Sequence, residues 1–330
     1  MIISRTPFRI SFFGGGTDYP VWYKKHGGAV LATSINKYCY ITCRYLPPFF
    51  DHKHHIVYSK AEYTKNVSEI LHPAVRESLL YMDISKGVEI HHDGDLPARA
   101  GLGTSSSFTV GMINALYALK GKIVTKRQLA LDAIHVEQER IKEHVGSQDQ
   151  ITAAFGGFNK IEFNGDEEFR VQPITISNEK CQLLQDHLIL FFTGLSRTAS
   201  EIAKEQIKKT PDRKNELKRM AEMVGEAINI LNENDSDLTD FGKLLHENWM
   251  IKRKLTEKIT TKSIDEIYER ARKAGALGGK LLGAGGGGFI LFYAEPKYHQ
   301  KIKEKLKDLL HVPFRFENLG SQIIYYTMGE

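Results

Sequence analysis

Apolar and polar residues alternate in two segments near the start of the chain, and this pattern predicts strands. The first segment is MIISRTPFRISFF (1–13), and the second is AVLATSINKYCYITCRYL (29–46), which is rich in β-branched and aromatic residues. Further on, apolar residues recur at helical spacing from Phe108 to Leu119, and Lys120-Gly121 supplies a plausible end. The first part of the chain therefore predicts a sheet and, after it, an amphipathic helix.

The later half of the chain has a different pattern, in which helices with charged outer faces dominate. We expect, in chain order, a strand at 186–193, helices around 200–208, 214–232, 238–255 and 263–273, a glycine loop feeding a strand within 278–296, a helix around 297–310, and strands near 313–316 and 322–327. This succession predicts an α+β unit built on an antiparallel sheet. We therefore divide the chain near residue 185, into an N-terminal domain (1–185) and a C-terminal domain (186–330).

Composition limits the classes of protein that this chain can belong to. Its 330 residues favour two packed domains over a single hydrophobic core. A composition of 42% hydrophobic and 26% charged residues is typical of a soluble globular protein. The sequence has no run of eighteen apolar residues, so we expect no membrane partner. The net charge of +5 is mild and spread along the chain, which argues against nucleic acid and favours an acidic small molecule. The start of the chain lacks the order of a signal peptide, so we expect a cytoplasmic protein.

Cysteine and histidine give little sign of a metal centre. The three cysteines, Cys39, Cys43 and Cys181, form no CxxC pair and predict buried free thiols in a reducing compartment. The histidine-rich stretch DHKHH (51–55) could suggest a metal site, but it follows two prolines and is better interpreted as a solvated loop.

A glycine- and serine-rich stretch, LPARAGLGTSSSFTVG (96–111), opens the predicted helix. Backbone amides at such a helix start are unsatisfied and lie at the positive end of the helix dipole, so they suit a phosphate group. The alternative is a tight turn with ordinary serine capping. A Walker A loop is excluded because Gly278-Gly279-Lys280-Leu281 lacks the hydroxyl after lysine, and a Rossmann fingerprint at 14–19 lacks its third glycine.

Two carboxylates stand near a second predicted helix, which begins at Thr125 and runs to about His144. Glu137 falls on the apolar face of this helix, so it should either pair with a basic side chain or hold a cation, and the sequence leaves both open. Asp149 follows in the polar segment VGSQDQ. A carboxylate and a serine suit Mg²⁺, and a separate aspartate could orient or deprotonate a hydroxyl nucleophile, which is the division of roles in phosphoryl transfer.

Three motifs together resemble one family, the GHMP small-molecule kinases. They are TPFRISFFGGGTDYP (6–20), LPARAGLGTSSS (96–107) and KLLGAGGGGFIL (280–291), in the family's order, and the resemblance covers nearly the whole chain. It implies a two-domain fold with an N-terminal α/β domain, a ferredoxin-like α+β C-terminal domain and the site in the cleft between them. It also implies ATP as co-substrate and Mg²⁺ as cofactor.

The resemblance also implies roles for individual residues. Asp149 would match the catalytic aspartate of the galactokinase branch, and Arg9 would stabilise charge on the transferred group and keep Asp149 ionised. Ser105 and Glu137 would hold Mg²⁺. The ATP-binding residues implied are Pro97, Gly101, Leu102, Gly103, Thr104, Ser105, Ser106 and Ser107. The substrate-binding residues implied are Gly15, Gly16, Thr17, Asp18, Arg197, Gly285 and Gly286.

The choice of acceptor depends on a departure from galactokinase. Gly15 and Gly16 stand where galactokinases carry a Glu-His pair that contacts the sugar, so the pocket should be roomier and galactose becomes doubtful. FGGGTDYP, GSQDQ and TGLSRTAS look more like the branch that phosphorylates the anomeric hydroxyl of D-glycero-D-manno-heptose 7-phosphate, and Arg197, at a predicted helix start, would suit the phosphate already on the sugar. The alternatives are a kinase for an unphosphorylated sugar, fucokinase- or galactokinase-like, and a sugar and nucleotide sensor without catalysis. We expect a monomer or a homodimer.

Overall fold

A long antiparallel sheet forms the first part of the molecule. The computed structural model describes residues 1–98, 100–165, 168–194, 199–233 and 238–327. The two predicted N-terminal strands are present as β1 (Ile2–Phe13) and β2 (Gly28–Tyr45), paired with each other along most of their length. The sheet runs in the order β13-β1-β2-β5-β3-β4, with β6, β7 and β12 attached to the side of this path. The further strands are β3 (His54–Val57), β4 (Ala61–Thr64), β5 (Val88–Gly94), β6 (Phe158–Phe163) and β7 (Phe169–Pro173).

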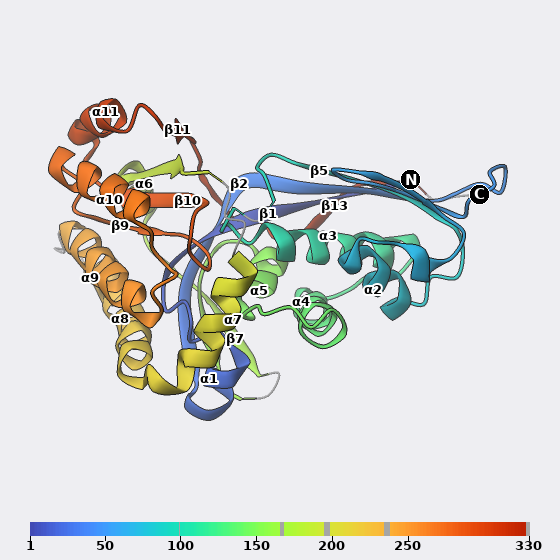
Figure 1. The fold of residues 1–330 in the computed structure, drawn as a ribbon, viewed down its shortest axis with the longest axis horizontal. Coiled ribbons are helices and arrows are strands. Elements are labelled where there is room, and N and C mark those ends of the chain that lie inside the picture. The colour runs from blue at the N-terminus through green and yellow to red at the C-terminus, as the bar shows by residue number, and fades with distance from the viewer. Residues whose placement is uncertain (99, 166–167, 195–198, 234–237, 328–330) are drawn as a thin grey trace.

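Helices α2 to α5 cover one side of this sheet (Figure 1). They are α2 (Pro73–Tyr81), α3 (Thr104–Leu119), α4 (Lys126–His135) and α5 (Gln148–Phe155), while α1 (Pro20–His26) lies between β1 and β2 in the chain. The face of α3 toward β1 and β2 carries small residues, because a Cβ on Gly111 would lie 2.8 Å from Oγ1 of Thr6 and 3.5 Å from Cγ1 of Ile41. Oγ of Ser4 donates to the carbonyl oxygen of Gly111 at 2.8 Å, so this close approach holds α3, and the glycine- and serine-rich stretch at its start, against the sheet.

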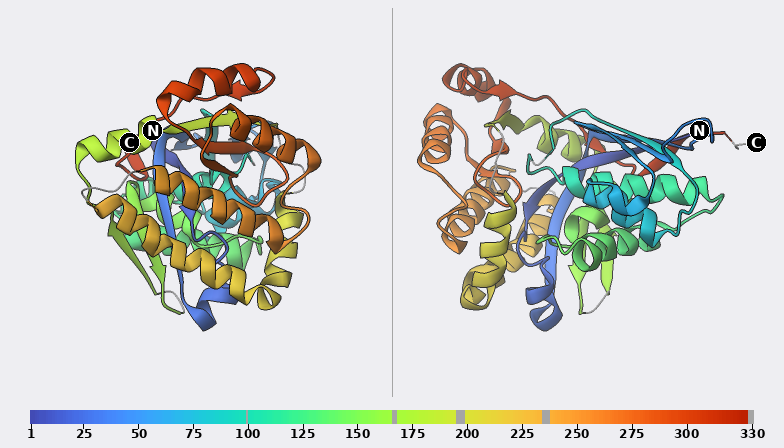
Figure 2. Two further views of the ribbon diagram at one scale, coloured as in Figure 1. Left: turned by 90° about the vertical axis from the view of Figure 1, so that its left-hand side faces the viewer. Right: turned by 45° about the vertical axis from the view of Figure 1, so that its right-hand side comes forward.

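The second sheet confirms the predicted ferredoxin-like domain. Its strands are β8 (Leu188–Phe192), β9 (Gly278–Leu281), β10 (Phe289–Tyr293) and β11 (Leu310–His311), in the spatial order β11-β8-β10-β9 with every pair antiparallel. The helices of this half are α6 (Asn178–Asp186), α7 (Ala199–Lys209), α8 (Lys214–Asn232), α9 (Thr239–Leu255), α10 (Lys262–Ala274) and α11 (Pro296–Lys305). Figure 2 shows this domain packed at one end of the long sheet. The mixed helices and sheets confirm the α+β class.

The end of the chain corrects the predicted domain boundary. The strands expected near 313–316 and 322–327 exist as β12 (Phe316–Glu317) and β13 (Gln322–Tyr326), but they pair with β2 and β1 of the first sheet. The prediction that residues 186–330 form one separate domain is therefore wrong for this segment. Met1 and Thr327 lie side by side, and the terminal ammonium donates to the hydroxyl of Thr327 at 2.8 Å. Alternation of apolar residues predicts a strand but not the sheet that it joins.

Two local predictions also need correction. The helix that begins at Thr125 ends earlier than His144, because α4 stops at His135 and a π-helical turn follows at Val136–Arg140. The stretch 51–55 is only partly a loop, since β3 begins at His54, whose side chain is buried beneath the sheet. Within the described residues no helix has the length and apolar character needed to cross a membrane.

Candidate active site

A cavity of about 320 Å³ lies where the two domains meet, and it gathers most of the predicted site residues. From the first domain and the start of α3 its walls include Arg9, Ser11, Gly15, Gly16, Asp18, Gly101, Gly103, Thr104, Ser105, Ser106, Gln148 and Asp149. The second domain contributes Lys252, Lys280, Gly283 and Ala284, among others. A larger cavity of about 520 Å³ lies beside α4 and is lined by none of the predicted residues.

An ion pair between Arg9 and Asp149 forms part of the cavity wall. Arg9, on β1, donates from Nε to Oδ1 of Asp149 at 2.7 Å and from Nη2 to Oδ2 at 2.8 Å. Its third nitrogen, Nη1, donates to the carbonyl oxygen of Gly101 at 2.7 Å, and the arginine is 4% exposed. The guanidinium therefore fixes the carboxylate and the glycine-rich stretch relative to each other, in the bidentate geometry that arginine favours.

The first turn of α5 directs three successive side chains to three different partners. Gln148 donates from Nε2 to Oδ2 of Asp18 at 2.9 Å, Asp149 accepts from Arg9, and Gln150 donates to Oε2 of Glu137. Successive residues of a helix point about 100° apart, which allows this divergence. The sequence analysis did not identify the two glutamines, and the only available signal was their place on either side of Asp149.

Asp18 is buried at 3% exposure and hydrogen bonded on both oxygens. The amide of Gly16 donates to its Oδ1 at 2.8 Å, and Gln148 donates to its Oδ2. Burial raises the pKa of Asp18, and the nearby Asp149 raises it further. Asp18 is thus placed in the cavity wall as expected, in a setting that favours its neutral form.

The other residues of the first motif divide into two groups. Gly15 and Gly16 line the cavity, and a Cβ on Gly15 would approach nothing closer than Oγ of Ser11, at 3.7 Å. The space beside Gly15 is therefore open, whereas a Cβ on Gly16 would lie 3.0 Å from Nε2 of Gln206, so the expected extra room is present at Gly15 and not at Gly16. Thr17 lies outside the cavity wall, and its hydroxyl instead binds the carbonyl oxygen of Gly14 at 2.8 Å within the turn.

The glycine- and serine-rich stretch enters α3 through Gly103, which has a φ of 71°. Gly103 provides no side chain to accept hydrogen bonds from the amides of the first helical turn, which leaves the positive end of the helix at the cavity. Three predicted ATP-binding residues lie off the cavity wall. Pro97 is exposed, Leu102 is in the core, and the Ser107 hydroxyl donates to the carbonyl oxygen of Pro7 at 2.8 Å.

Glu137 is buried at 1% exposure, and its serine neighbour is Ser106. The hydroxyl of Ser106 donates to Oε2 of Glu137 at 2.8 Å, whereas Ser105, the predicted partner, is exposed and lines the cavity. Ser105 and Ser106 are adjacent in the helix, so their side chains point about 100° apart and only that of Ser106 is directed at Glu137. Burial raises the pKa of Glu137 to about 7. Of the two interpretations left open for Glu137, pairing with a basic side chain finds no support in its hydrogen-bond partners.

The third motif packs directly against the second. A Cβ on Gly283 would lie 2.5 Å from Cα of Gly101, and one on Gly288 would lie 2.3 Å from the carbonyl oxygen of Ala100. The two glycine-rich segments therefore approach each other closely because neither carries a side chain at these points. Gly285 and Gly286, predicted to bind substrate, lie outside the cavity wall, and the amide of Gly286 donates to the carbonyl oxygen of Ile259 at 3.0 Å.

Two buried lysines of the second domain were missed by the sequence analysis. Lys252, on α9, donates from Nζ to the carbonyl oxygens of Leu281 at 3.0 Å and Gly283 at 2.6 Å, and burial lowers its pKa to about 7. Lys280 donates to the carbonyl oxygen of Phe12 at 2.8 Å, and burial lowers its pKa well below the usual range. The signal for Lys252 was a lysine on the apolar face of a helix. Arg197, predicted to bind a sugar phosphate, lies outside the described residues.

These features are those of a phosphotransferase with an alcohol group as acceptor, and comparison with known proteins provides the family. Residues 63–157 match the model of the GHMP kinases N terminal domain, and residues 216–311 match that described as GHMP kinases C terminal. The chain belongs to the GHMP kinase family. The motif resemblance seen in the sequence is thereby confirmed.

Relatives of known name match over almost the whole chain. The chain is 30% identical to D-glycero-alpha-D-manno-heptose 7-phosphate kinase of Campylobacter jejuni over 97% of both chains. It is 24% identical to galactokinase of Thermotoga neapolitana over 95% of both. In fold it resembles the crystal structure of a D-glycero-D-manno-heptose 1-phosphate kinase from Bacteroides thetaiotaomicron, with a TM-score of 0.74, 24% identity, and coverage of 99% of this chain and 100% of that chain.

Proposed function

We propose that this chain transfers the terminal phosphoryl group of ATP to the anomeric hydroxyl of a sugar phosphate. D-glycero-D-manno-heptose 7-phosphate is the preferred acceptor, which would give the 1,7-bisphosphate in nucleotide-activated heptose biosynthesis. The observation that carries the proposal is the bidentate Arg9–Asp149 pair in a cavity wall that also contains the start of α3. The 30% identity to a heptose 7-phosphate kinase over the full length supports the choice of sugar.

Asp149 would act on the acceptor hydroxyl, and Arg9 on the phosphoryl group that is transferred. The carboxylate of Asp149 orients the acceptor hydroxyl and takes up its proton as the new O–P bond forms. Arg9 is already hydrogen bonded to the carbonyl oxygen of Gly101, so its charge lies where the phosphates would rest on the amides of α3. A fixed cation there stabilises the charge that spreads over the transferred group.

The residues near Glu137 fit the Mg²⁺ that accompanies ATP in such reactions. Oε1 of Glu137 is buried without a hydrogen-bond partner among the described residues, and the serine on Oε2 reaches the cavity wall. Glu137 would hold the ion together with the hydroxyl of Ser105 or Ser106, since carboxylate and hydroxyl oxygens are ligands that Mg²⁺ accepts. When bound, the ion would neutralise part of the negative charge of the phosphates.

Lys252 and Lys280 support a phosphorylated acceptor over a neutral one. Both lysines line the cavity. The negative charge of Asp149 is already paired with Arg9, and the raised pKa of Asp18 favours its neutral form, so little negative charge in the cavity offsets that of the lysines. Burial lowers the pKa of both amines, and a phosphate bound beside them would favour their protonated form and accept hydrogen bonds from it.

The experiment that tests the proposal measures ATP consumption with a panel of sugars and sugar phosphates, with identification of the product by NMR. We expect turnover with heptose 7-phosphate and a new phosphate at the anomeric carbon. Lys252→Gln keeps a donor for the glycine loop but removes the charge, so it should raise KM for the sugar phosphate about 10-fold and leave KM for a neutral sugar within about twofold. Lys254→Gln, on the exposed side of the same helix, is the matched control.

Two outcomes would favour the other candidates. Preference for an unphosphorylated sugar, with equal effects of Lys252→Gln on both acceptors, would indicate a fucokinase- or galactokinase-like enzyme, for which the galactokinase relative provides support. Binding of sugar and nucleotide without turnover would indicate a sensor on the same scaffold. The Arg9–Asp149 pair weighs against the sensor, because binding alone does not require it.

A further inference from the structure

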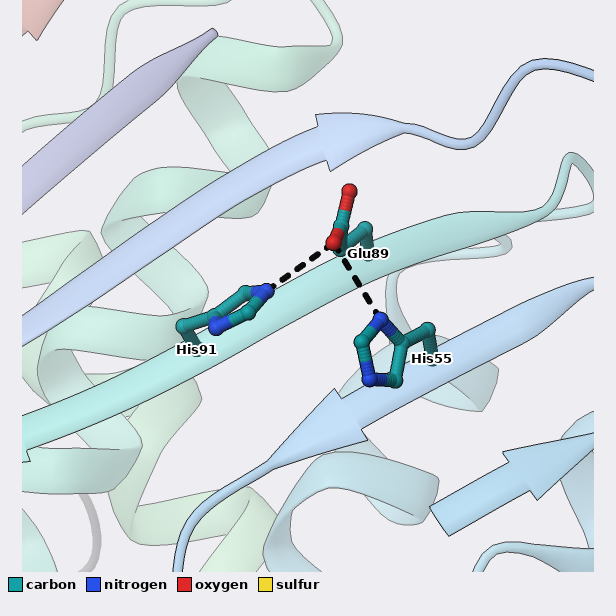
Figure 3. Close-up of side chains that lie close together, drawn as sticks. All are labelled: His55, Glu89 and His91. Carbon is teal, nitrogen blue, oxygen red and sulfur yellow. Dashed lines mark hydrogen bonds and ion pairs between the residues drawn. The ribbon is translucent and has the colours of Figure 1, made fainter. Parts of the chain in front are cut away.

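A second group of polar side chains lies on the long sheet, away from the cavity. Figure 3 shows His55 on β3 with Glu89 and His91 on β5. Across the parallel ladder His55 is opposite Glu89, and Val57 is opposite His91, so the three side chains occupy neighbouring positions on one face. Ile56 and Ile90, which alternate with them, are buried on the side covered by helices. The three polar residues therefore face away from those helices.

The ligand atoms of this group are already close together. Nδ1 of His55 lies 3.2 Å and Nε2 of His91 lies 3.0 Å from the same oxygen, Oε1 of Glu89, and all three atoms lie within 4.8 Å of one another. Ligands bound about 2.0 Å from a tetrahedral zinc ion lie roughly 3.3 Å apart. The two distances from the histidine nitrogens to Oε1 of Glu89 are thus close to the ligand separation in a tetrahedral zinc site.

The surrounding residues hold the group in place. Arg44 donates from Nε to the other oxygen of Glu89, Oε2, at 2.6 Å, which leaves Oε1 directed at the histidines. The ring of His55 is stacked on that of Tyr63, with centroids 4.5 Å apart and planes 10° apart. Such outer contacts fix the orientation of metal ligands before the metal arrives.

We propose that His55, Glu89 and His91 form a binding site for a zinc ion, separate from the catalytic cavity. Two imidazole nitrogens and one carboxylate oxygen are a ligand set typical of zinc, with water in the fourth position. In the metal-free protein the two rings donate protons to Oε1, and on binding each ring would present that nitrogen to the ion and carry its proton on the other. None of the three residues lines the catalytic cavity, so the ion would tie β3 to β5 without taking part in phosphoryl transfer.

The test is a calorimetric titration of metal-free protein with Zn²⁺ alone. We expect one tight equivalent for the natural chain, and binding at this site at least about 10-fold weaker in His55→Gln and in His91→Gln, since each variant removes one of three ligands. Glutamine keeps a donor for Glu89, so the metal-free fold should persist. The matched control is His135→Gln, an exposed histidine on α4, which should bind like the natural chain.

Equal affinity in the natural chain and both cluster variants, or no tight equivalent at all, would overturn the proposal. A second readout does not depend on the variants. Titration with Co²⁺ should produce the intense visible absorption of a tetrahedral site in the natural chain, and its absence would also overturn the proposal. Zinc should in addition raise the Tm of the natural chain and of His135→Gln, but not that of either cluster variant.

Discussion

Glu137 and Glu89 are the same residue type in opposite electrostatic settings. Glu137 is buried beside the cavity between the two domains, and Ser106 and Gln150, which donate to its Oε2, are neutral. Burial raises its pKa to about 7. Burial would also raise the pKa of Glu89 on the open sheet face, but hydrogen bonds from His91, Arg44 and His55 bring it down to about 2. Depth therefore decides the form that Glu137 favours, whereas at the less deeply buried Glu89 the hydrogen bonds and the charge of Arg44 outweigh the effect of burial.

Asp149 shows that both kinds of setting occur close to the cavity between the two domains. It lies one residue from Gln150, the neutral partner of Glu137, yet its own partner is the guanidinium of Arg9. A helix turn can therefore separate a cation-paired carboxylate from one with neutral partners. The ionised carboxylate of Asp149 would suit proton uptake from a hydroxyl. A divalent cation bound at Glu137 would convert that carboxyl group to its charged form.

The largest expected effect is that of Asp149→Asn, which removes the cation-paired carboxylate. Turnover should fall by about 10³-fold or more, because the acceptor loses the group that orients it and takes up its proton. Nucleotide binding, measured by fluorescence titration, should change little because the start of α3 is intact. Asp51→Asn, at an exposed loop position, is the control. Turnover like that of the natural chain would remove Asp149 from the mechanism.

The second effect concerns the stability contribution of Glu137. Between its ordinary pKa of 4.5 and about 7, the folded protein keeps a proton on Glu137 that the unfolded chain releases, so the natural chain loses stability as pH rises through this window. Glu137→Gln carries no such proton. Without Mg²⁺, its free energy of unfolding should exceed that of the natural chain by about 1–3 kcal/mol at pH 8, and the excess should vanish near pH 4.5.

Urea unfolding at the two pH values measures this difference. Glu139→Gln, an exposed glutamate on the same π-helical turn, should show no comparable dependence on pH. A difference between Glu137→Gln and the natural chain that does not change with pH would contradict the raised pKa.

The smallest effect is expected from Glu89→Gln in the absence of zinc. The lowered pKa of Glu89 means that its ionised form stabilises the fold above pH 4.5, and this contribution is lost as pH falls toward 2. The Arg44 side chain is 47% exposed, so water and salt screen the pair, and the loss at pH 7 should be at most about 1 kcal/mol.

Urea unfolding at pH 7 and pH 3, at low and high salt, checks the prediction for Glu89. Asp93→Asn, an exposed acid further along β5, is the control. A loss for Glu89→Gln as large as the gain for Glu137→Gln, or one that grows as pH falls, would break the contrast between the two carboxyl groups.

Local structure was predictable where the signal lies within a few neighbouring residues. The helix expected at 214–232 is α8 at the same residues, and the start of α4 is capped by Thr125, whose hydroxyl accepts from the amide of Gln128 at 3.2 Å. Amphipathic periodicity and helix caps depend on residues three or four positions apart, so the sequence alone contains them. The same periodicity placed Glu137 on a buried face.

The choice of partners depended on the tertiary structure. The rotation of α3 relative to the π-helical turn decides which serine contacts Glu137. The pairing of β3 with β5, which are about thirty residues apart in the chain, brings His55 next to Glu89. The return of β12 and β13 to the first sheet is of the same kind. The sequence by itself determined many of the elements, among them β1, β2, α3 and α8, and the family. Register and helix rotation, which depend on packing between distant segments, decided which side chains meet.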